Sequence, residues 1–165
     1  MKKVTAFIFS VALLILTISP IVQAQNYISD DLYDTYSFTE YFEDGSYTVT
    51  TIKQSPAKAL SAYSAVYTKI GEKHVDLFSS DDELQWEYTL IGTFQVNEGV
   101  SAVCTNSTYS SKIHVSGWSL ITHDNTYSNN IARGTATYKK KVLFITTNTH
   151  DVEVAIGCDK YGNVG

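Results

Sequence analysis

Residues 84–96 alternate between two kinds of position, and this alternation constrains the fold more than any other feature of the chain. One parity is apolar and holds Leu84, Trp86, Tyr88, Leu90, Gly92, Phe94 and Val96. The other parity is polar except for Ile91. A period of two is typical of a β-strand that buries one face and exposes the other. We therefore expect a long strand with Trp86 and Tyr88 in the core and Gln85 facing solvent.

Turn signals between alternating segments predict antiparallel hairpins. The Asp-Gly pair at 44–45 supplies the positive φ values of a type I′ turn. Residues 97–99 form a short turn after the long strand, and the acidic segment 79–83 forms another before it. The return strand after residue 99 places Val100, Ala102 and Cys104 on one face.

The remaining assignments rest on shorter patterns. Residues 62–70, 132–138, 142–147 and 152–158 are expected to be β segments. Ser116-Gly117 predicts a bulge that reverses the facing side chains. Residues 123–130 are expected to form a polar turn, whereas 148–151 fit either a turn or a continuing strand. Residues 56–63 are the one helical candidate.

Seven or eight short antiparallel strands with regular turns predict an all-β fold. We expect one antiparallel β-sandwich, immunoglobulin-like in size, over residues 36–165. Residues 25–35 contain several Asp and Tyr side chains and no Lys or Arg, and we expect them to form a flexible arm.

Residues 1–24 have the three regions of a secretory signal peptide. Lys2 and Lys3 precede an apolar run over 4–18, and Val22-Gln23-Ala24 ends in a small residue before Gln25. We expect cleavage after Ala24, a secreted extracellular product and no membrane attachment afterwards.

The net charge of the chain limits the classes of partner that we expect it to bind. Without Lys2 and Lys3, the formal charge of −5 becomes −7. An acidic protein of this kind is a poor candidate for binding nucleic acid or an anionic membrane. We expect a monomer that needs no cofactor.

Two cysteines remain after the predicted cleavage. Cys104 and Cys158 lie on the apolar parity of their strands, and export favours oxidation. We predict a Cys104–Cys158 disulfide, which would contribute about 4 kcal/mol by closing a long loop. Two buried free thiols are the alternative.

Several short motifs give the chain a family resemblance. They are WEYTLIGTF at 86–94, DGSY at 44–47, GTAT at 134–137 and CDKYGN at 158–163. With Cys104 and Trp118 at their spacing, these motifs resemble small secreted proteins of gut clostridia over most of residues 42–163. The resemblance implies export and a β domain, and it transfers no catalytic role to any residue.

Few side chains suggest chemistry. His123-Asp124 and His150-Asp151 could share a metal if two loops met, but exposed turn residues are the favoured interpretation. Cys104 could be a nucleophile, yet its core-facing position indicates a structural cysteine. We predict no catalytic residues and no metal site.

Other surface features have a functional and a structural interpretation. Residues 79–83 could bind calcium, although a solvated turn fits their spacing better. Lysines 139–141 could bind an anionic wall polymer or guard a sheet edge. Trp118 could lie in the core or on the surface. Tyr27, Tyr33 and Tyr36 could contact a partner or the domain itself.

The sequence therefore predicts a secreted, non-catalytic binding module of unknown ligand, with a glycan, a cell-wall polymer or a protein as candidates. One alternative is a small secreted effector or toxin-like factor. A second is a small hydrolase whose site is assembled from separate loops.

Overall fold

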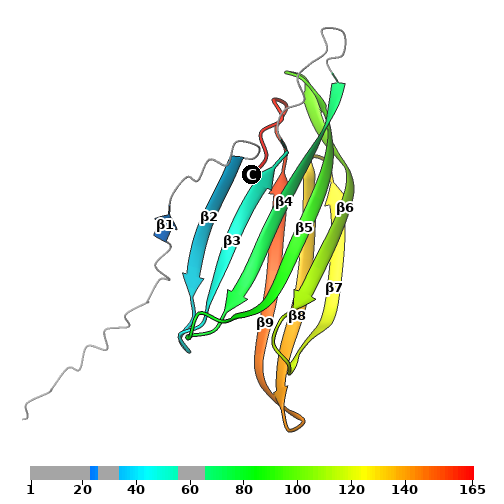
Figure 1. Ribbon diagram of the computed structural model, residues 1–165. Helices are drawn as coiled ribbons and strands as arrows, with labels where there is room; N and C mark the ends of the chain where they lie inside the picture. Colours follow the sequence, from blue (N-terminus) through cyan, green and yellow to red (C-terminus); the bar gives the residue numbers. More distant parts are fainter. Residues whose placement is uncertain (1–22, 26–33, 56–65) are drawn as a thin grey trace, which may run out of the picture.

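The computed structural model describes residues 23–25, 34–55 and 66–165, and this part of the chain is all β (Figure 1). The strands form two antiparallel sheets, as expected for a β-sandwich. The larger sheet contains β1 (Gln23–Gln25), β2 (Asp34–Tyr41), β3 (Tyr47–Gln54), β4 (Val66–Phe78), β5 (Leu84–Asn97) and β6 (Ser101–Ile113). The smaller sheet contains β7 (Trp118–Ser128), β8 (Ile131–Val142) and β9 (Ile145–Gly157).

Each strand pairs with the next one along the chain, except where β6 passes to β7 in the other sheet. The core lies where β4, β5 and β6 face the smaller sheet. The alternation in β5 fills this core as predicted, because Trp86, Tyr88, Leu90, Phe94 and Val96 are all buried. The Trp86 ring stacks on Tyr138 of β8, with 4.0 Å between ring centroids and 3° between planes.

Gln85 departs from the predicted parity, since it is buried rather than solvent-facing. Leu77 of β4 pairs with Trp86 whereas Phe78 pairs with Leu84, so Gln85 lies at a β-bulge. A bulge inserts one residue without a cross-strand partner and re-aims side chains. The expectation for Gln85 was therefore wrong, and Trp118, which the sequence left undecided, is buried beside it.

The predicted hairpin turns at 44–45, 79–83 and 97–99 all lie between consecutive strands. The type I′ assignment at 44–45 is wrong, because Gly45 alone of the pair has a positive φ, at 82°. Phe42 N–H donates to the Ser46 carbonyl (2.9 Å), which makes the turn wider than two residues.

Two other local predictions need correction. The polar segment 123–130 is mostly strand, since β7 continues to Ser128 and the turn consists of Asn129 and Asn130. Residues 116–117 do not form a bulge within a strand, because they lie in the link between the sheets, where Gly117 has a φ of 91°. Of the two interpretations of 148–151, the continuing strand is correct.

Some predictions fall on residues that the structure does not describe. These are most of the signal peptide, residues 26–33 of the arm and the helical candidate at 56–63. Gln23–Gln25 pairs with Ser37–Thr39 of β2 and spans the predicted cleavage position. β2 begins at Asp34, so the last two residues assigned to the arm lie in this strand.

The predicted Cys104–Cys158 disulfide is not formed, and both residues are buried free thiols. They flank the 129–130 turn, where their N–H groups donate to the Asn129 and Asn130 carbonyls respectively. Each sulfur is directed at a nearby backbone carbonyl, that of Asn106 for Cys104 and that of Asp159 for Cys158. Burial raises the pKa of both thiols, to about 11 for Cys158.

Candidate functional site

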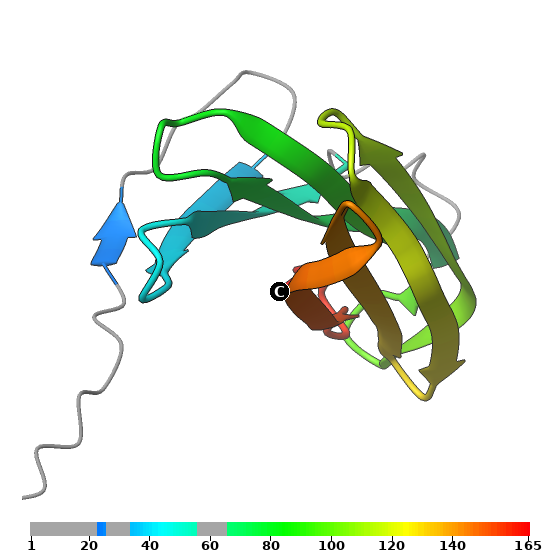
Figure 2. The same ribbon diagram turned by 90° about the horizontal axis from the view of Figure 1, so that it is seen from below.

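The unequal width of the two sheets leaves part of the larger one uncovered. β9 packs on β4 and β5, whereas β2 and β3 extend beyond it. Figure 2 shows the larger sheet curving past the smaller one on this side. The inner face of β2 and β3 and the edge of β9 enclose a groove of about 280 Å³.

The floor of the groove combines aromatic and polar side chains. Phe38 pairs with Thr50 and Glu40 pairs with Thr48 across β2 and β3. Residues that pair directly share one face of a sheet, and all four line the groove together with Phe42. The phenyl rings are half-buried and the two threonines are buried. Concave apolar sites with a few polar groups are typical of ligand binding.

The wall of the groove is the edge of β9, the last strand of its sheet in the described chain. Gly157 already pairs on this side: its N–H donates to the Gly165 carbonyl (2.8 Å) and its carbonyl accepts from Gly165 N–H (3.1 Å). Alternate residues of an antiparallel strand direct their backbone groups to the same side. The N–H and C=O groups of Ala155, Glu153 and Asp151 therefore face the groove.

Two contacts bound the accessible length of this edge. Lys73 Nζ donates to the Ala155 carbonyl (3.3 Å) and lies 6.0 Å from the centroid of the Phe38 ring. At the other end, Asn148 Nδ2 donates to Asp44 Oδ2 (3.3 Å). Between them the edge covers residues 149–153, about 16 Å at ~3.3 Å per residue.

The groove carries more acidic than basic side chains. Glu40, Asp151 and Glu153 line it with one lysine, Lys73, whose pKa is lowered by burial. Burial also lowers the pKa of His150 from 6.5, although Asp44 and Asp151 act in the opposite direction. A neutral His150 fits its surroundings, because its ring lies 4.9 Å from that of Phe42 and 5.6 Å from that of Trp118.

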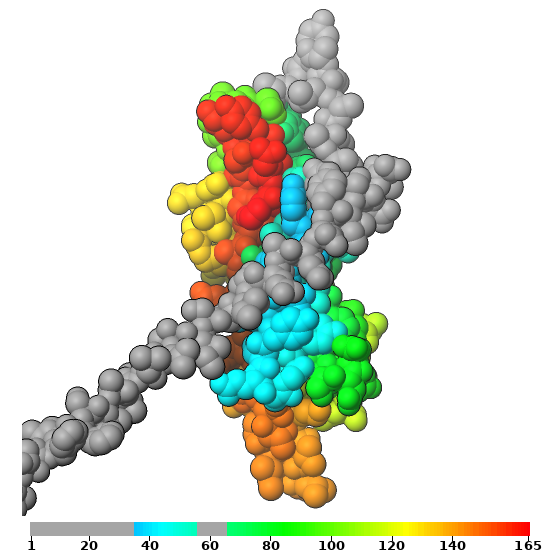
Figure 3. Space-filling view, turned by 90° about the vertical axis from the view of Figure 1, so that its left-hand side faces the viewer, coloured from blue at the N-terminus to red at the C-terminus, as the bar shows by residue number. Residues whose placement is uncertain are grey.

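A second unusual feature is the turn between β8 and β9, here called the hairpin tip (residues 142–145). Leu143 is 85% exposed and Phe144 is 99% exposed. Figure 3 shows this orange tip projecting beyond the cyan and green turns at the same end of the molecule. A run of exposed apolar residues is a recognised mark of an interaction site.

The backbone of the hairpin tip is strained as well as exposed. Val142 pairs with Ile145, so only Leu143 and Phe144 form the loop, with φ values of 48° and 71°. Two-residue loops with positive φ at both positions normally use Asn-Gly. A bulky residue in this region costs about 1–2 kcal/mol. The conformation of the tip therefore lowers the stability of the folded protein, while its two large apolar side chains remain exposed.

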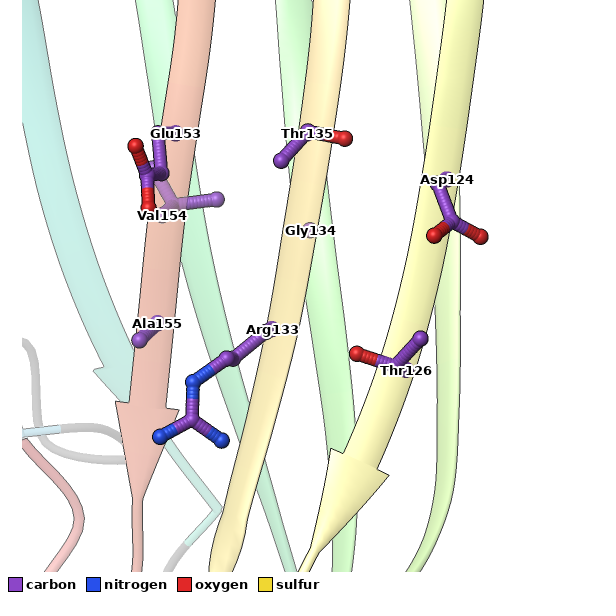
Figure 4. A pocket seen from close by; sticks show the side chains of 8 residues that line it. All are labelled: Asp124, Thr126, Arg133, Gly134, Thr135, Glu153, Val154 and Ala155. Carbon is purple, nitrogen blue, oxygen red and sulfur yellow. The ribbon is translucent and has the colours of Figure 1, made fainter.

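A second depression, of about 400 Å³, lies on the outer face of the smaller sheet. Its charged residues are Asp124, Arg133 and Glu153, and Figure 4 shows their side chains pointing in different directions rather than toward a common centre. The hollow lies over Gly134, and a Cβ atom there would meet the Tyr88 hydroxyl at 2.3 Å on the core side. This depression is therefore a weaker candidate than the groove.

The histidines that could have shared a metal lie in different surroundings. His123 of β7 pairs with Ala136 and contacts the Tyr109 ring (4.3 Å), whereas His150 pairs with Tyr138 and faces the core beside the groove. Neither lies in a turn, so the favoured interpretation of both as turn residues was also wrong. Among the residues that the structure describes, no three His, Cys, Asp or Glu side chains are grouped for a metal ion.

The acidic segment 79–83 is organised as a turn. Ser79 Oγ accepts hydrogen bonds from the N–H groups of Asp81 (3.3 Å) and Glu83 (3.2 Å), and Asp82 Oδ1 accepts one from the Tyr47 hydroxyl (2.9 Å).

The lysines 139–141 lie beside the hairpin tip, at the end of β8. Of the arm tyrosines, Tyr36 is exposed in β2, while Tyr27 and Tyr33 lie outside the described residues.

Comparison of the chain with known protein families, with curated proteins and with solved structures finds no match. In the described ranges, no helix is long and apolar enough to cross a membrane. The groove was not predicted because it depends on how far one sheet extends past the other. The tip left no turn signal either, since residues 142–145 are four apolar residues without a turn former, a pattern that predicts a strand.

Proposed function

We propose that the protein is an extracellular binding protein whose groove receives an extended polypeptide segment, which adds as a strand to the edge of β9. The observation that carries this proposal is the antiparallel pairing of Gly157 with Gly165 and of Cys158 with Val164 on that same edge. A peptide entering the groove would continue the pairing toward Asp151. Strand addition gives affinity through backbone hydrogen bonds.

The groove also indicates what kind of segment it would select. A strand presents alternate side chains to opposite faces, so every second side chain of the ligand would rest on Phe38 and Phe42. The acidic residues Glu40, Asp151 and Glu153 line the same space. We therefore propose a segment of about five residues, from the 16 Å of accessible edge, with apolar or aromatic residues and at least one Lys or Arg.

Export by the signal peptide at 1–24 is part of this proposal, since it would present the groove outside the cell. A secreted effector could use the same groove on its target. The hydrolase alternative has less support, because His150 makes no hydrogen bond to a carboxylate or a nucleophile among the described residues, and its ring packs instead against those of Phe42 and Trp118.

Selection of a phage-displayed random peptide library on the secreted protein tests the proposal. The expected result is a set of peptides with apolar residues at every second position. The decisive pair of variants is Glu153→Pro and Glu153→Ala. Proline removes the N–H that faces the groove and leaves the pairing with β8 intact, whereas alanine removes only the carboxylate.

We expect Glu153→Pro to weaken binding of a selected peptide at least tenfold more than Glu153→Ala does, with both variants folded by circular dichroism. Equal affinities would contradict strand addition at β9. If no peptide is selected and the protein instead binds a soluble glycan, and if Phe38→Ala abolishes that binding, the ligand of the groove is a carbohydrate and not a polypeptide.

A further inference from the structure

The hairpin tip is separate from the groove and calls for its own explanation. It contains Val142, Leu143, Phe144 and Ile145, all of them exposed, at the end of the long β8–β9 hairpin. Neither the core nor the groove uses these side chains. A soluble surface gains nothing from four adjacent apolar residues in a strained two-residue loop, so an external partner is the physical reason for them.

Charge next to the tip points to the partner. Lys139, Lys140 and Lys141 directly precede the tip, and residues 139–148 contain no acidic side chain. Lys140 Nζ lies 5.8 Å from the centroid of the Trp118 ring, which positions this ammonium at the base of the hairpin end. An apolar point with ammonium groups beside it on one strand suits the boundary between lipid headgroups and acyl chains.

Acidic turns at the same end of the molecule lie farther back. Asp44 contacts Asn148, which pairs with Lys140, whereas Val142 and Ile145 form the outermost pair of the hairpin. The segment 79–83 belongs to the β4–β5 turn, and Figure 1 shows the β8–β9 turn reaching beyond it. A flat anionic surface would therefore meet the apolar tip and Lys141 before it met these carboxylates.

We propose that the hairpin tip docks on a lipid bilayer, with Leu143 and Phe144 inserted below the headgroups and the lysines in contact with lipid phosphates. The rest of the sandwich stays outside the bilayer. This inference departs from the expectation of no membrane contact, which rested on the net charge of the whole chain rather than on its distribution. It does not depend on the proposed peptide ligand.

Vesicle flotation with the protein recovered from culture medium tests the proposal. Its N-terminus is first determined by mass spectrometry, because a retained apolar run at 4–18 would bind vesicles by itself. Vesicles of phosphatidylcholine alone and with 30% phosphatidylglycerol are compared. We expect binding to both, stronger to the anionic vesicles and weakened there by salt.

Three variants locate the contact. Leu143→Asn with Phe144→Gly should reduce binding to either vesicle about tenfold or more, because both inserted side chains are lost. Lys139→Gln with Lys141→Gln should reduce binding about tenfold on anionic vesicles only. The matched control is Val100→Asn, which alters an exposed apolar residue in the β5–β6 turn and should leave binding unchanged.

Phe144→Trp gives a direct measure of insertion. The natural tryptophans, Trp86 and Trp118, are buried, so a blue shift on adding vesicles reports the new indole. No binding by the wild-type protein, equal binding by the Leu143→Asn/Phe144→Gly variant, or an indole that stays solvated would each overturn the proposal. A change in oligomeric state on altering the tip, without any lipid binding, would replace the bilayer by a second copy of the chain.

Discussion

The Nε1–H group of Trp118 donates a hydrogen bond to Oε1 of Gln85, with 3.2 Å between nitrogen and oxygen, inside the sandwich. Gln85 reaches this position because it lies at the bulge between β4 and β5. The contact connects the two sheets near the end that carries the hairpin tip. It also leaves a buried indole N–H dependent on one glutamine.

Gln85→Ala should therefore destabilise the protein by about 1–3 kcal/mol, because a buried donor loses its partner. The matched control is Gln95→Ala in the same strand and on the same sequence parity, where the side chain is exposed. We expect that control to change stability by less than about 0.5 kcal/mol. Chemical denaturation measures both, and equal midpoints would show that the Gln85–Trp118 bond contributes nothing.

Gly134 is expected to tolerate no side chain while Tyr88 keeps its hydroxyl. A Cβ atom at Gly134 would lie 2.3 Å from that hydroxyl oxygen, which is buried and has no hydrogen-bond partner among the described residues. Gly134→Ala should cost about 1–3 kcal/mol through overpacking. Tyr88→Phe removes the clashing atom, so the double variant should recover most of this loss. If the changes in the free energy of unfolding caused by the two single substitutions simply add in the double variant, the explanation is contradicted.

The lowered pKa of His150 predicts how the stability of the protein responds to mild acid. Burial lowers its pKa in the folded state below the ordinary 6.5, so the unfolded chain binds the proton more readily. Stability should fall as the pH drops below about 6.5, until the pH passes the folded-state pKa. His150→Asn should remove this part of the pH dependence. Melting temperatures of the wild type and of His150→Asn between pH 7.5 and pH 5 provide the test. If the melting temperatures of both proteins fall equally with pH, the prediction is contradicted.

The protein should be more stable when the two apolar residues of the hairpin tip are replaced. Leu143→Asn with Phe144→Gly supplies the residues that tolerate the two positive φ values, and relief of strain should raise stability by about 1–3 kcal/mol. A purely structural tip would instead lose stability when its apolar side chains are removed. Thermal unfolding distinguishes these outcomes, and a lower melting temperature would contradict the strain argument.

Strands were predicted best from the sequence where one face of the strand is buried and the other is exposed. β5 and the end of β9 alternate clearly, because both cover the core. β7 was interpreted as a polar turn over 123–130 because most of its side chains are exposed on both faces, which removes the alternation. Gln85 could not be predicted from parity, since a bulge changes parity without altering composition.

The functional features depend on relationships that local patterns do not encode. The groove exists because six strands pair on one side and three on the other, so that β2 and β3 have no facing strand among the described residues. The hairpin tip was expected to be strand, because residues 142–147 contain apolar and β-branched side chains and no glycine or asparagine. Only the backbone conformation of Leu143 and Phe144 identifies it as a turn.

Amide hydrogen exchange on the β9 edge tests strand addition most directly. The N–H groups of Asp151 and Glu153 face the groove, whereas those of Val152 and Val154 face β8. In the free protein we expect fast exchange at 151 and 153 and slow exchange at 152 and 154. A saturating selected peptide should slow exchange at 151 and 153 at least tenfold and leave 152 and 154 unchanged. Unchanged exchange at 151 and 153 with the peptide bound would contradict the proposed function.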